Sequence, residues 1–432
     1  MNWREQYKSF LWIAAFFLFA YFMPVNNNTF QNGVSDALSL AQWYAREHVL
    51  FCLVPAFFIA GVIAVFVSQA AVIKYFGVTA KKWIAYLVAS VSGSILAVCS
   101  CTVLPLFSGI HKRGAGLGPA IAFLYSGPAI NILAIILTAR VLGMRLGVAR
   151  VIGAVSFSLL IGYLMSLIYR KEERQKAEAQ MVLPPVEESR PIWQTALHFF
   201  ILVGILVAAT WGKPASQQGV WHFVYVNKWT MTGILGLGLA ASLMYILKLN
   251  KKHVLFGAAG VILLALAFPM NPVIPFIAAV VVLTLLLSFS KGEPNEWMGE
   301  TWGFTRQILP LLGAGVLIAG FLLGSPDGGN GVVPSHWISG MVGGNSLFAN
   351  FFASIVGAFM YFATLTEVPI LQGLIHNGMG QGPALALLLA GPALSLPNML
   401  VIRGVIGTQK TIVYVSLVVI MATISGIIFG SL

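Results

Sequence analysis

Long stretches without a charged residue constrain the fold of this chain more than any other feature of its sequence. Of its 432 residues 58% are hydrophobic and only 9% are charged, whereas a soluble protein carries about 25% charged residues. Each stretch exceeds or approaches the roughly 20 apolar residues that cross a bilayer core. The stretches are continuous, which favours helices over the alternating pattern of barrel strands. They cover 9–35, 48–73, 83–111, 114–139, 151–169, 191–212, 229–247, 253–290, 307–326, 328–366, 368–402 and 411–432. The predicted fold class is an all-α polytopic membrane protein.

The lengths of these stretches predict about thirteen membrane-spanning helices. The stretch 253–290 is too long for one helix and contains "FPMNPVIP", which indicates a hairpin break. The segment 34–48 is amphipathic and is expected to lie at the membrane interface. The expected helices lie near 10–25, 49–72, 83–108, 117–139, 150–169, 192–211, 230–247, 253–269, 273–290, 305–324, 345–370, 382–402 and 411–430.

One hydrophilic segment, 170–191, separates two groups of apolar stretches. It holds 10 of the 38 charged residues and predicts a water-exposed cytoplasmic linker. The basic loop 248–252 is expected on the same side, and 325–345, which has no Lys or Arg, on the other. We therefore divide the chain into an N-terminal span with an interfacial segment, a first transmembrane repeat, the linker, intervening helices and a second repeat. These parts cover 1–48, 49–169, 170–191, 192–304 and 305–432.

The two predicted repeats contain segments that align with each other. Residues 105–131 align without a gap to 369–395, and 12 of the 27 positions are identical. Most identities are glycine or proline, whereas two unrelated apolar helices would share leucine and alanine. Repeats with Gly/Pro-interrupted spans at matching positions point to the binding site of a secondary transporter. The sequence leaves open whether the repeats run parallel or inverted.

Each aligned segment holds a Gly-Pro pair that predicts a helix break near the bilayer centre. Pro128 and Pro392 each follow a helix-starting proline by nine residues, or about 14 Å, half of the hydrocarbon thickness. Irregular backbone at this depth must be buried in protein or line a cavity, although a simply packed kink is the alternative. The residues expected to shape the breaks are Pro105, Gly127, Pro128, Pro369, Gly391 and Pro392, and the expected polar ligands of a solute are Asn131, Ser395 and Asn398.

Two cysteines, Cys99 and Cys101, stand one residue apart just before the first aligned segment. An ideal helix places such residues on different faces, so both sulfur atoms reach one ligand only if the backbone leaves helical geometry. Paired thiolates suit soft metals and, by the same logic, trivalent arsenicals. We interpret them as ligands of a transported metalloid and not of a resident metal, with Cys52 as a candidate third sulfur. The alternative is that all three are small buried hydrophobic residues.

Few charged residues lie near the two aligned segments. Glu367 is the only acid from 328 to 402, and an acid inside the membrane is a candidate for proton or cation coupling. The alternative is a loop end at the water boundary. His111, Lys112 and Arg113 predict either a gate that attracts anions or a solvated loop that only sets topology. His376 lies close to the matching position of the second repeat and could titrate in the same range.

Several function classes are excluded. The sequence has no nucleotide-binding loop, no dinucleotide fingerprint and no zinc-protease motif. We therefore expect a transporter and no enzyme, without a cofactor, driven by a gradient or a separate partner. The net charge of +12 comes from loops beside apolar stretches, which indicates anionic lipid and not nucleic acid. The expected partners are a small solute or metalloid and membrane lipid, with a homo-oligomer left open. The expected location is the bacterial cytoplasmic (inner) membrane.

The motifs in 98–131 also resemble those of a known family. This segment contains "VCSCTVLPLF", the basic run "HKRG" and then "FLYSGPAIN". It resembles the predicted bacterial permease family that includes the ArsP and YraQ proteins, over nearly the whole chain from residue 49. The resemblance implies export of trivalent organoarsenicals in some members and other transport in others. It also implies that Cys99 and Cys101 are the family's paired cysteines, with Pro105, Gly114 and Pro128 as structural marks. Thr102 departs from the glycine common in this motif, which leaves the substrate open.

Three functions remain open from the sequence. The first, which we favour, is a secondary efflux permease for a soft, thiol-reactive metalloid, with Cys99 and Cys101 as transient ligands and Glu367 as the coupling acid. The second is a permease for a small inorganic anion or other small solute, attracted by Lys112 and Arg113, with structural cysteines. The third is a membrane thiol oxidoreductase, against which the lack of a second cysteine pair argues.

Overall fold

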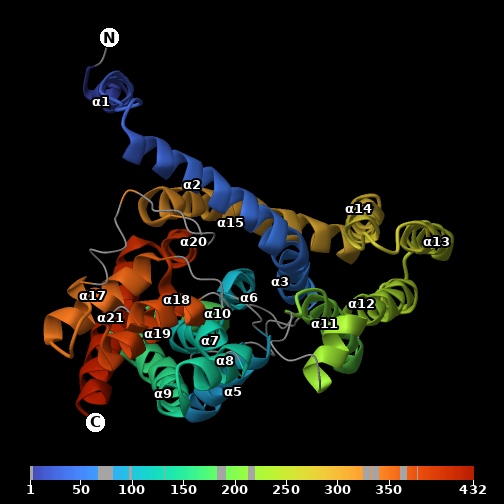
Figure 1. Cartoon of the computed structure of the whole chain (residues 1–432). Coiled ribbons are helices and arrows are strands. Elements are labelled where there is room, and N and C mark those ends of the chain that lie inside the picture. Colours follow the sequence, from blue (N-terminus) through green and yellow to red (C-terminus); the bar gives the residue numbers. More distant parts are fainter. Residues whose placement is uncertain are drawn as a thin grey trace.

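The chain folds almost entirely into helices (Figure 1). The computed structural model describes residues 3–66, 81–96, 100–130, 132–181, 191–212, 219–324, 332, 340–360, 367–376 and 378–432. Within these residues the β-structure is an isolated bridge between Gly343 and Met379. The helices are α1 (Trp3–Tyr21), α2 (Asn28–Tyr44), the π-helix η1 (Ala45–Leu53), α3 (Val54–Phe66), α5 (Lys82–Leu96), α6 (Ser100–Lys112), α7 (Leu117–Ala129), α8 (Ile132–Val141), α9 (Met144–Ile168), α10 (Arg170–Met181), α11 (Ile192–Ala209), α12 (Val220–Tyr245), α13 (Lys251–Ala267), α14 (Val273–Ser288), α15 (Glu293–Leu323), α17 (Leu347–Phe359), α18 (Glu367–His376), α19 (Gln381–Leu394), α20 (Leu396–Ile406) and α21 (Thr408–Ser431). This confirms the predicted all-α polytopic fold class.

Several expected spans are divided into two helices. Among the described residues, four helical runs are long and apolar enough to cross a membrane alone: Asn28–Phe66, α9, α15 and α21. The bent pair α19 and α20 makes a fifth if it counts as one span. The expected helices near 83–108, 117–139, 345–370 and 382–402 each correspond to two separate elements. The number of spans therefore stays a prediction.

The segment 34–48 does not form a separate helix, and its position at the membrane interface stays a prediction. It lies within the continuous run of α2, η1 and α3, which passes along α15 (Figure 1). Ala37 and Leu40 are buried there, and a Cβ added to Gly320 of α15 would lie 2.8 Å from Ala37 Cα. The amphipathic pattern of this segment thus reflects packing against α15, because the face turned to α15 needs small and apolar side chains.

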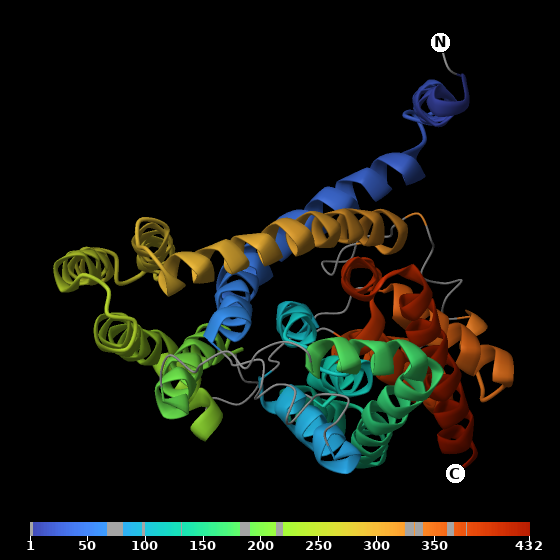
Figure 2. The same cartoon turned by 180° about the vertical axis from the view of Figure 1, so that it is seen from behind.

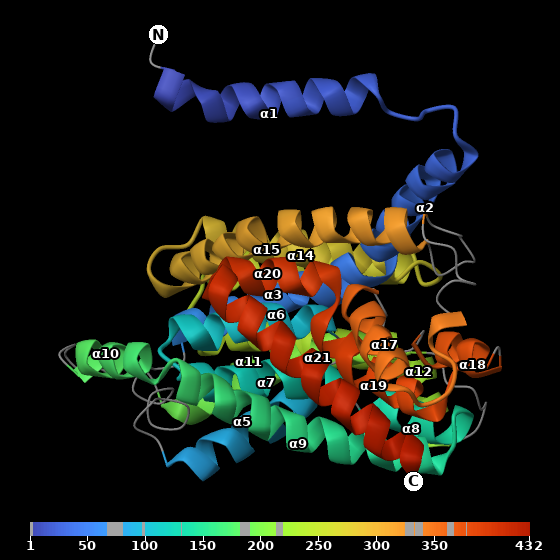
Figure 3. The ribbon, with the colours of Figure 1, turned by 90° about the vertical axis from the view of Figure 1, so that its left-hand side faces the viewer.

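Helices at the edge of the molecule expose large apolar side chains. The helix α1 stands apart from the rest of the chain (Figure 3) and exposes Phe10, Phe16 and Phe17. The helices α11 to α14 extend to one side of the main bundle, as both Figure 1 and the view from behind in Figure 2 show. Exposed apolar surface of this extent is typical of contact with lipid.

The main bundle contains two groups of three helices, and the central helix of each group is almost completely buried. The first pack is α5, α7 and α9, and the second pack is α17, α19 and α21; in both, the helices contact one another. Every residue of α7 is buried, as is every residue of α19 from Gly382 to Leu394. The two central helices also contact each other, so the core of the bundle lies where the packs meet.

The two packs are held together internally by matching contacts. A Cβ on Gly162 would lie 2.7 Å from the Gly118 carbonyl oxygen, and one on Gly426 would lie 2.8 Å from the Gly382 carbonyl oxygen. Each outer pair of helices also shares a hydroxyl contact, Ser90 to Ser158 at 2.9 Å in the first pack and Ser354 to Thr423 at 3.1 Å in the second. Small residues permit such close helix approach in membranes, and hydroxyl groups hydrogen-bond across helices.

Candidate functional site

The central helix of each pack ends shortly after its Gly-Pro pair. Pro128 lies one residue before the end of α7, and α8 begins at Ile132. Pro392 lies two residues before the end of α19, and α20 follows after Ser395 with a bend of 47°. Each proline removes the backbone N–H that would pair with the carbonyl four residues before it, which weakens the last helical turn. Both ends are buried within the protein.

Two of the prolines expected to shape helix breaks, Pro105 and Pro369, lie inside described helices. The helix α6 passes through Pro105 and continues to Lys112. Pro369 is the third residue of α18, where its missing N–H would have no partner within the helix in any case. Pro105 is the sixth residue of α6, so its missing N–H leaves the Cys101 carbonyl without a helical partner, yet the helix continues beyond it.

The helix that follows each central helix contacts the helix that precedes the other central helix. The helix α8 contacts α18, and α20 contacts α6, while α7 and α19 lie against each other. The Tyr125 hydroxyl of α7 donates a hydrogen bond to the Leu389 carbonyl of α19, at 2.9 Å. Both interruptions therefore adjoin a buried contact between the first and second halves of the chain.

A buried ion pair crosses this contact. Glu367 is the first residue of α18, and its Oε1 lies 2.5 Å from Nη2 of Arg150 on α9. The two side chains are 1% and 0% exposed, and Arg150 Nη1 also donates a hydrogen bond to Thr138 Oγ1 of α8, at 2.8 Å. The structure thus places Glu367 inside the protein and beside a cation, and not at a water boundary.

Several buried polar atoms near the interruptions have no hydrogen-bond partner among the described residues. They include Ser395 Oγ and Asn398 Oδ1 at the start of α20, whose side chains are 3% and 2% exposed. Arg150 Nε and Tyr414 Oη, on α9 and α21, belong to the same group. Buried polar groups are nearly always hydrogen-bonded, so these atoms have unused capacity for a solute or water.

Part of the predicted site falls outside the described residues. Cys99 and Asn131 are not among them, and of Cys101 and His376 only the helical backbone is described. Cys52 is buried in η1, which contacts α6. A shared site for the sulfur atoms therefore stays a prediction. In the part of the chain that is described, no three His, Cys, Asp or Glu side chains gather to hold a metal ion.

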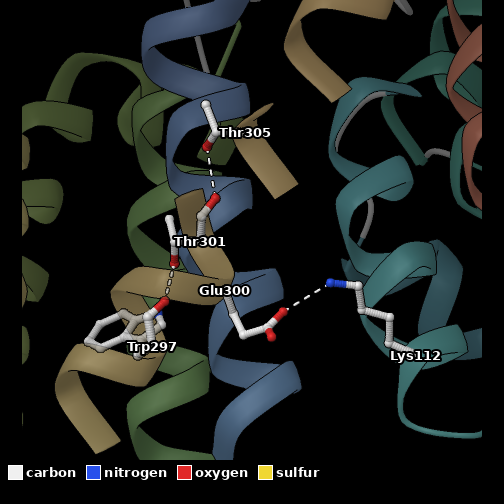
Figure 4. Close-up of polar contacts among 5 residues, drawn as sticks. All are labelled: Lys112, Trp297, Glu300, Thr301 and Thr305. Carbon is white, nitrogen blue, oxygen red and sulfur yellow. Dashed lines mark hydrogen bonds and ion pairs between the residues drawn. The ribbon is translucent and has the colours of Figure 1, made fainter. Parts of the chain in front are cut away.

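The basic residues at the end of α6 form a charge-balanced contact with α15. Lys112 Nζ lies 3.0 Å from Glu300 Oε2, with 46% and 41% of the two side chains exposed (Figure 4). Arg113 is half-buried; burial lowers the pKa of its guanidinium, and the charge of Glu300 opposes this shift. His111 stacks on Phe107. Because Glu300 offsets the positive charge here, this end of α6 attracts anions less than the sequence alone suggests.

The hydrophilic linker is only partly exposed to water. Residues 170–181 form the helix α10, and its Glu173 is buried. The Leu117 backbone N–H donates a hydrogen bond to Glu173 Oε2 at 2.8 Å, so this carboxylate caps the start of α7. The neighbouring Glu172 pairs with Lys410 of α21. Among the described side chains of α10, Glu173 alone is buried, and the helix contacts both packs through Glu172 and Glu173. The cytoplasmic position of this linker stays a prediction.

The sequence did not indicate the partners of Glu367. Neither Arg150 nor Thr138, to which Arg150 donates a hydrogen bond, was among the expected site residues. The signal that pointed to Arg150 was Glu367 itself, because an acid within an apolar stretch requires a compensating cation. Arg140, Arg145 and Arg150 are the basic residues between the first aligned segment and the hydrophilic segment 170–191.

Interrupted helices that meet at a buried contact are the architecture of secondary transporters. The fold and the site thus place the chain in the class of multi-pass membrane permeases. Consistent with this class, the chain belongs to the ArsP_1 family, described as "Predicted permease", whose model matches residues 35–431. The resemblance noted from the cysteine motif is therefore confirmed.

Three relatives carry the family designation UPF0718. The protein MJ0584 of Methanocaldococcus jannaschii is 41% identical over 389 residues, which cover 90% of this chain and 93% of the relative. YraQ of Escherichia coli is 35% identical over 88 residues, 20% of this chain and 24% of YraQ. YcgR of Bacillus subtilis is 25% identical over 122 residues, 28% of this chain and 41% of YcgR. No solved structure matches the chain.

Proposed function

We propose that this protein is a secondary-active permease that exports a soft, thiol-reactive metalloid, such as a trivalent arsenical, across the cytoplasmic membrane. The observation that carries the proposal is the buried contact between α7 and α19, beside which both central helices are interrupted. Irregular backbone inside a membrane protein is tolerated where it is buried in protein or lines a solute's path.

The elements that would bind the solute lie next to one another. Cys101 lies in the first turn of α6, and Cys99 precedes this helix in the sequence. The helix α6 contacts α20, at whose start the oxygens of Ser395 and Asn398 have no hydrogen-bond partner among the described residues. Thiolates are soft donors that suit trivalent arsenic. Two sulfur ligands hold such a solute less firmly than three, which suits a carrier because it must release what it binds.

The proposed coupling residue is Glu367. Its carboxylate pairs with Arg150, and this pair joins α18 to α9 across the contact between the packs. Protonation of Glu367 would remove the attraction that holds these two helices together. Proton binding at this residue is therefore a physical means of letting one part of the bundle move relative to the other.

We further propose that the two packs descend from one duplicated unit. Two observations support this: the matching glycine contacts, Gly118 with Gly162 and Gly382 with Gly426, and the matching hydroxyl contacts between the outer helices. The corresponding glycines, Gly118 with Gly382 and Gly162 with Gly426, are separated by the same number of residues as the two aligned segments. A duplicated transporter can present its site alternately to either side by moving one unit against the other.

The cysteines provide the direct test of the proposed cargo. In an arsenic-sensitive host, the variants Cys99→Ser and Cys101→Ser should abolish resistance to methylarsenite while the protein stays in the membrane. The matched control is Cys52→Ser, which removes the buried thiol of η1 and should leave resistance intact. Full resistance in a variant that carries both Cys99→Ser and Cys101→Ser would refute the metalloid assignment.

A further inference from the structure

The Arg150 side chain is an unusual group to find at the centre of a membrane protein. It is fully buried, and its one charged neighbour among the described residues is Glu367. The other ion pairs among the described residues, Lys112 with Glu300 and Lys410 with Glu172, each have a partner that is at least 41% exposed to solvent. Arg150 and Glu367 must therefore neutralise each other without help from water.

The hydrogen-bonding capacity of this pair is not used up. A guanidinium has five N–H donors, and here Nη1 donates to Thr138 while Nη2 lies against Glu367. Arg150 Nε has no hydrogen-bond partner among the described residues, and Glu367 Oε1 accepts no well-aligned hydrogen bond. A buried ion pair that serves only to stabilise a fold requires its remaining donors and acceptors to be satisfied. Among the described residues, this pair leaves donors available for a further oxygen ligand.

The geometry of the guanidinium indicates the class of ligand. Its planar fork binds two oxygen atoms carried by one centre, as in a carboxylate, phosphate or sulfate group. The group that now lies against it is itself a carboxylate, that of Glu367. We propose that Arg150 is the binding site for an oxyanion substrate of this permease, and that Glu367 occupies the site while the substrate is absent.

Charge balance then links the oxyanion to a proton. When a monovalent oxyanion displaces ionised Glu367 from Arg150, the buried site carries one excess negative charge. A proton taken up by Glu367 restores neutrality, so one proton is bound with each oxyanion. Of the elements around Glu367, α9 contributes the charge of Arg150, α19 has no charged residue, and Arg140 of α8 is exposed. Tyr125 of α7 and Tyr414 of α21 are buried phenols, uncharged at neutral pH.

The same exchange releases a link between the two halves of the chain. Arg150 belongs to the first pack, and Glu367 begins the helix that precedes α19 of the second. Once the oxyanion replaces Glu367, no ion pair joins α9 to α18. The inference rests on the proposed permease function but does not depend on the cysteines or on a metalloid.

The test measures binding to the purified full chain in nanodiscs, with inorganic phosphate, sulfate and acetate as probes and chloride as the reference anion. Wild type should bind at least one probe saturably and take up one proton for each monovalent anion bound. Glu367→Gln should bind the same probe roughly tenfold more tightly, because the competing carboxylate is gone, and should take up no proton. Arg150→Gln should lose binding, and Arg150→Lys should bind more weakly because an ammonium lacks the planar fork.

A purely structural role for the pair gives a different pattern. Both interpretations predict that Glu367→Gln and Arg150→Gln weaken the protein, but a purely structural role predicts that neither variant improves binding of any probe. The variant with both substitutions is neutral and reports whether the fold survives without the pair. Failure of all three probes to bind, or unchanged affinity in Glu367→Gln, would overturn the inference. Loss of methylarsenite resistance in the cysteine variants would still support metalloid export in that case, so the two proposals fail separately.

Discussion

The ion pairs of this protein differ in how much water surrounds them. Lys112 and Glu300 are both well exposed, and such a pair contributes about 0–1 kcal/mol to stability. Arg150 and Glu367 are buried, and removing one member of such a pair costs about 3–5 kcal/mol because the other is left as an uncompensated charge. Burial thus distinguishes a surface contact from one on which the arrangement of helices depends.

Some residues of the site could be predicted from the sequence and others could not. Glu367 could be identified from the sequence because a single acid within a long apolar stretch stands out without any knowledge of the fold. Arg150 was not, because its role depends on a partner more than two hundred residues away along the chain. Glu173 was missed for a related reason: a charged segment suggests solvent, and only the fold shows that α10 lies against the start of α7.

The cap on α7 gives a prediction at this scale. Glu173→Ala removes the acceptor of the Leu117 N–H and should lower the free energy of unfolding by about 1 kcal/mol, because a buried donor is left unpaired. The matched control is Glu172→Ala, which removes an exposed acid from the same helix and should change stability less. Thermal unfolding of the purified protein in detergent measures both, and equal effects would count against the cap.

At the scale of elements, the Gly-Pro pairs were the sequence feature that best predicted where helices end. They predicted interruptions in two spans, and α7 and α19 do end one and two residues after their prolines. Pro369 lies in the first turn of α18, where proline breaks no helical hydrogen bond, whereas Pro105 lies inside α6, which continues beyond it. The sequence does not show where the preceding helix ends, and it therefore predicted single spans where the structure has pairs.

The glycine contacts give a prediction for these elements. Gly162→Ala and Gly426→Ala each place a Cβ less than 3 Å from a carbonyl oxygen of the neighbouring central helix. Each should destabilise the protein by about 1–3 kcal/mol, because the helices must move apart. Gly233→Ala is the control: no atom lies within 4 Å of its Cβ position on α12, so the change should be neutral or stabilise by about 0.5–1 kcal/mol. Thermal unfolding that ranks Gly233→Ala with the other two would contradict the proposed packing.

For the whole molecule, composition alone identified the class. With 9% charged residues and a series of long apolar stretches, a soluble fold was excluded, and the helical membrane fold followed from the need to satisfy every backbone group. The arrangement of the two packs did not follow. Central helices such as α7 and α19 are apolar on every side, so no pattern in their sequences marks the face that meets the partner.

The central claim is that the two halves of the chain meet at a buried contact that Arg150 and Glu367 join. The most direct measurement is a double-mutant cycle on the purified protein, with the free energy of unfolding determined for wild type, Arg150→Gln, Glu367→Gln and the variant with both changes. The account predicts that each single change is strongly destabilising and that the double change costs much less than their sum, with a coupling of about 3 kcal/mol. Effects that simply add would contradict it, because they would mean that the two side chains do not face each other in the folded protein.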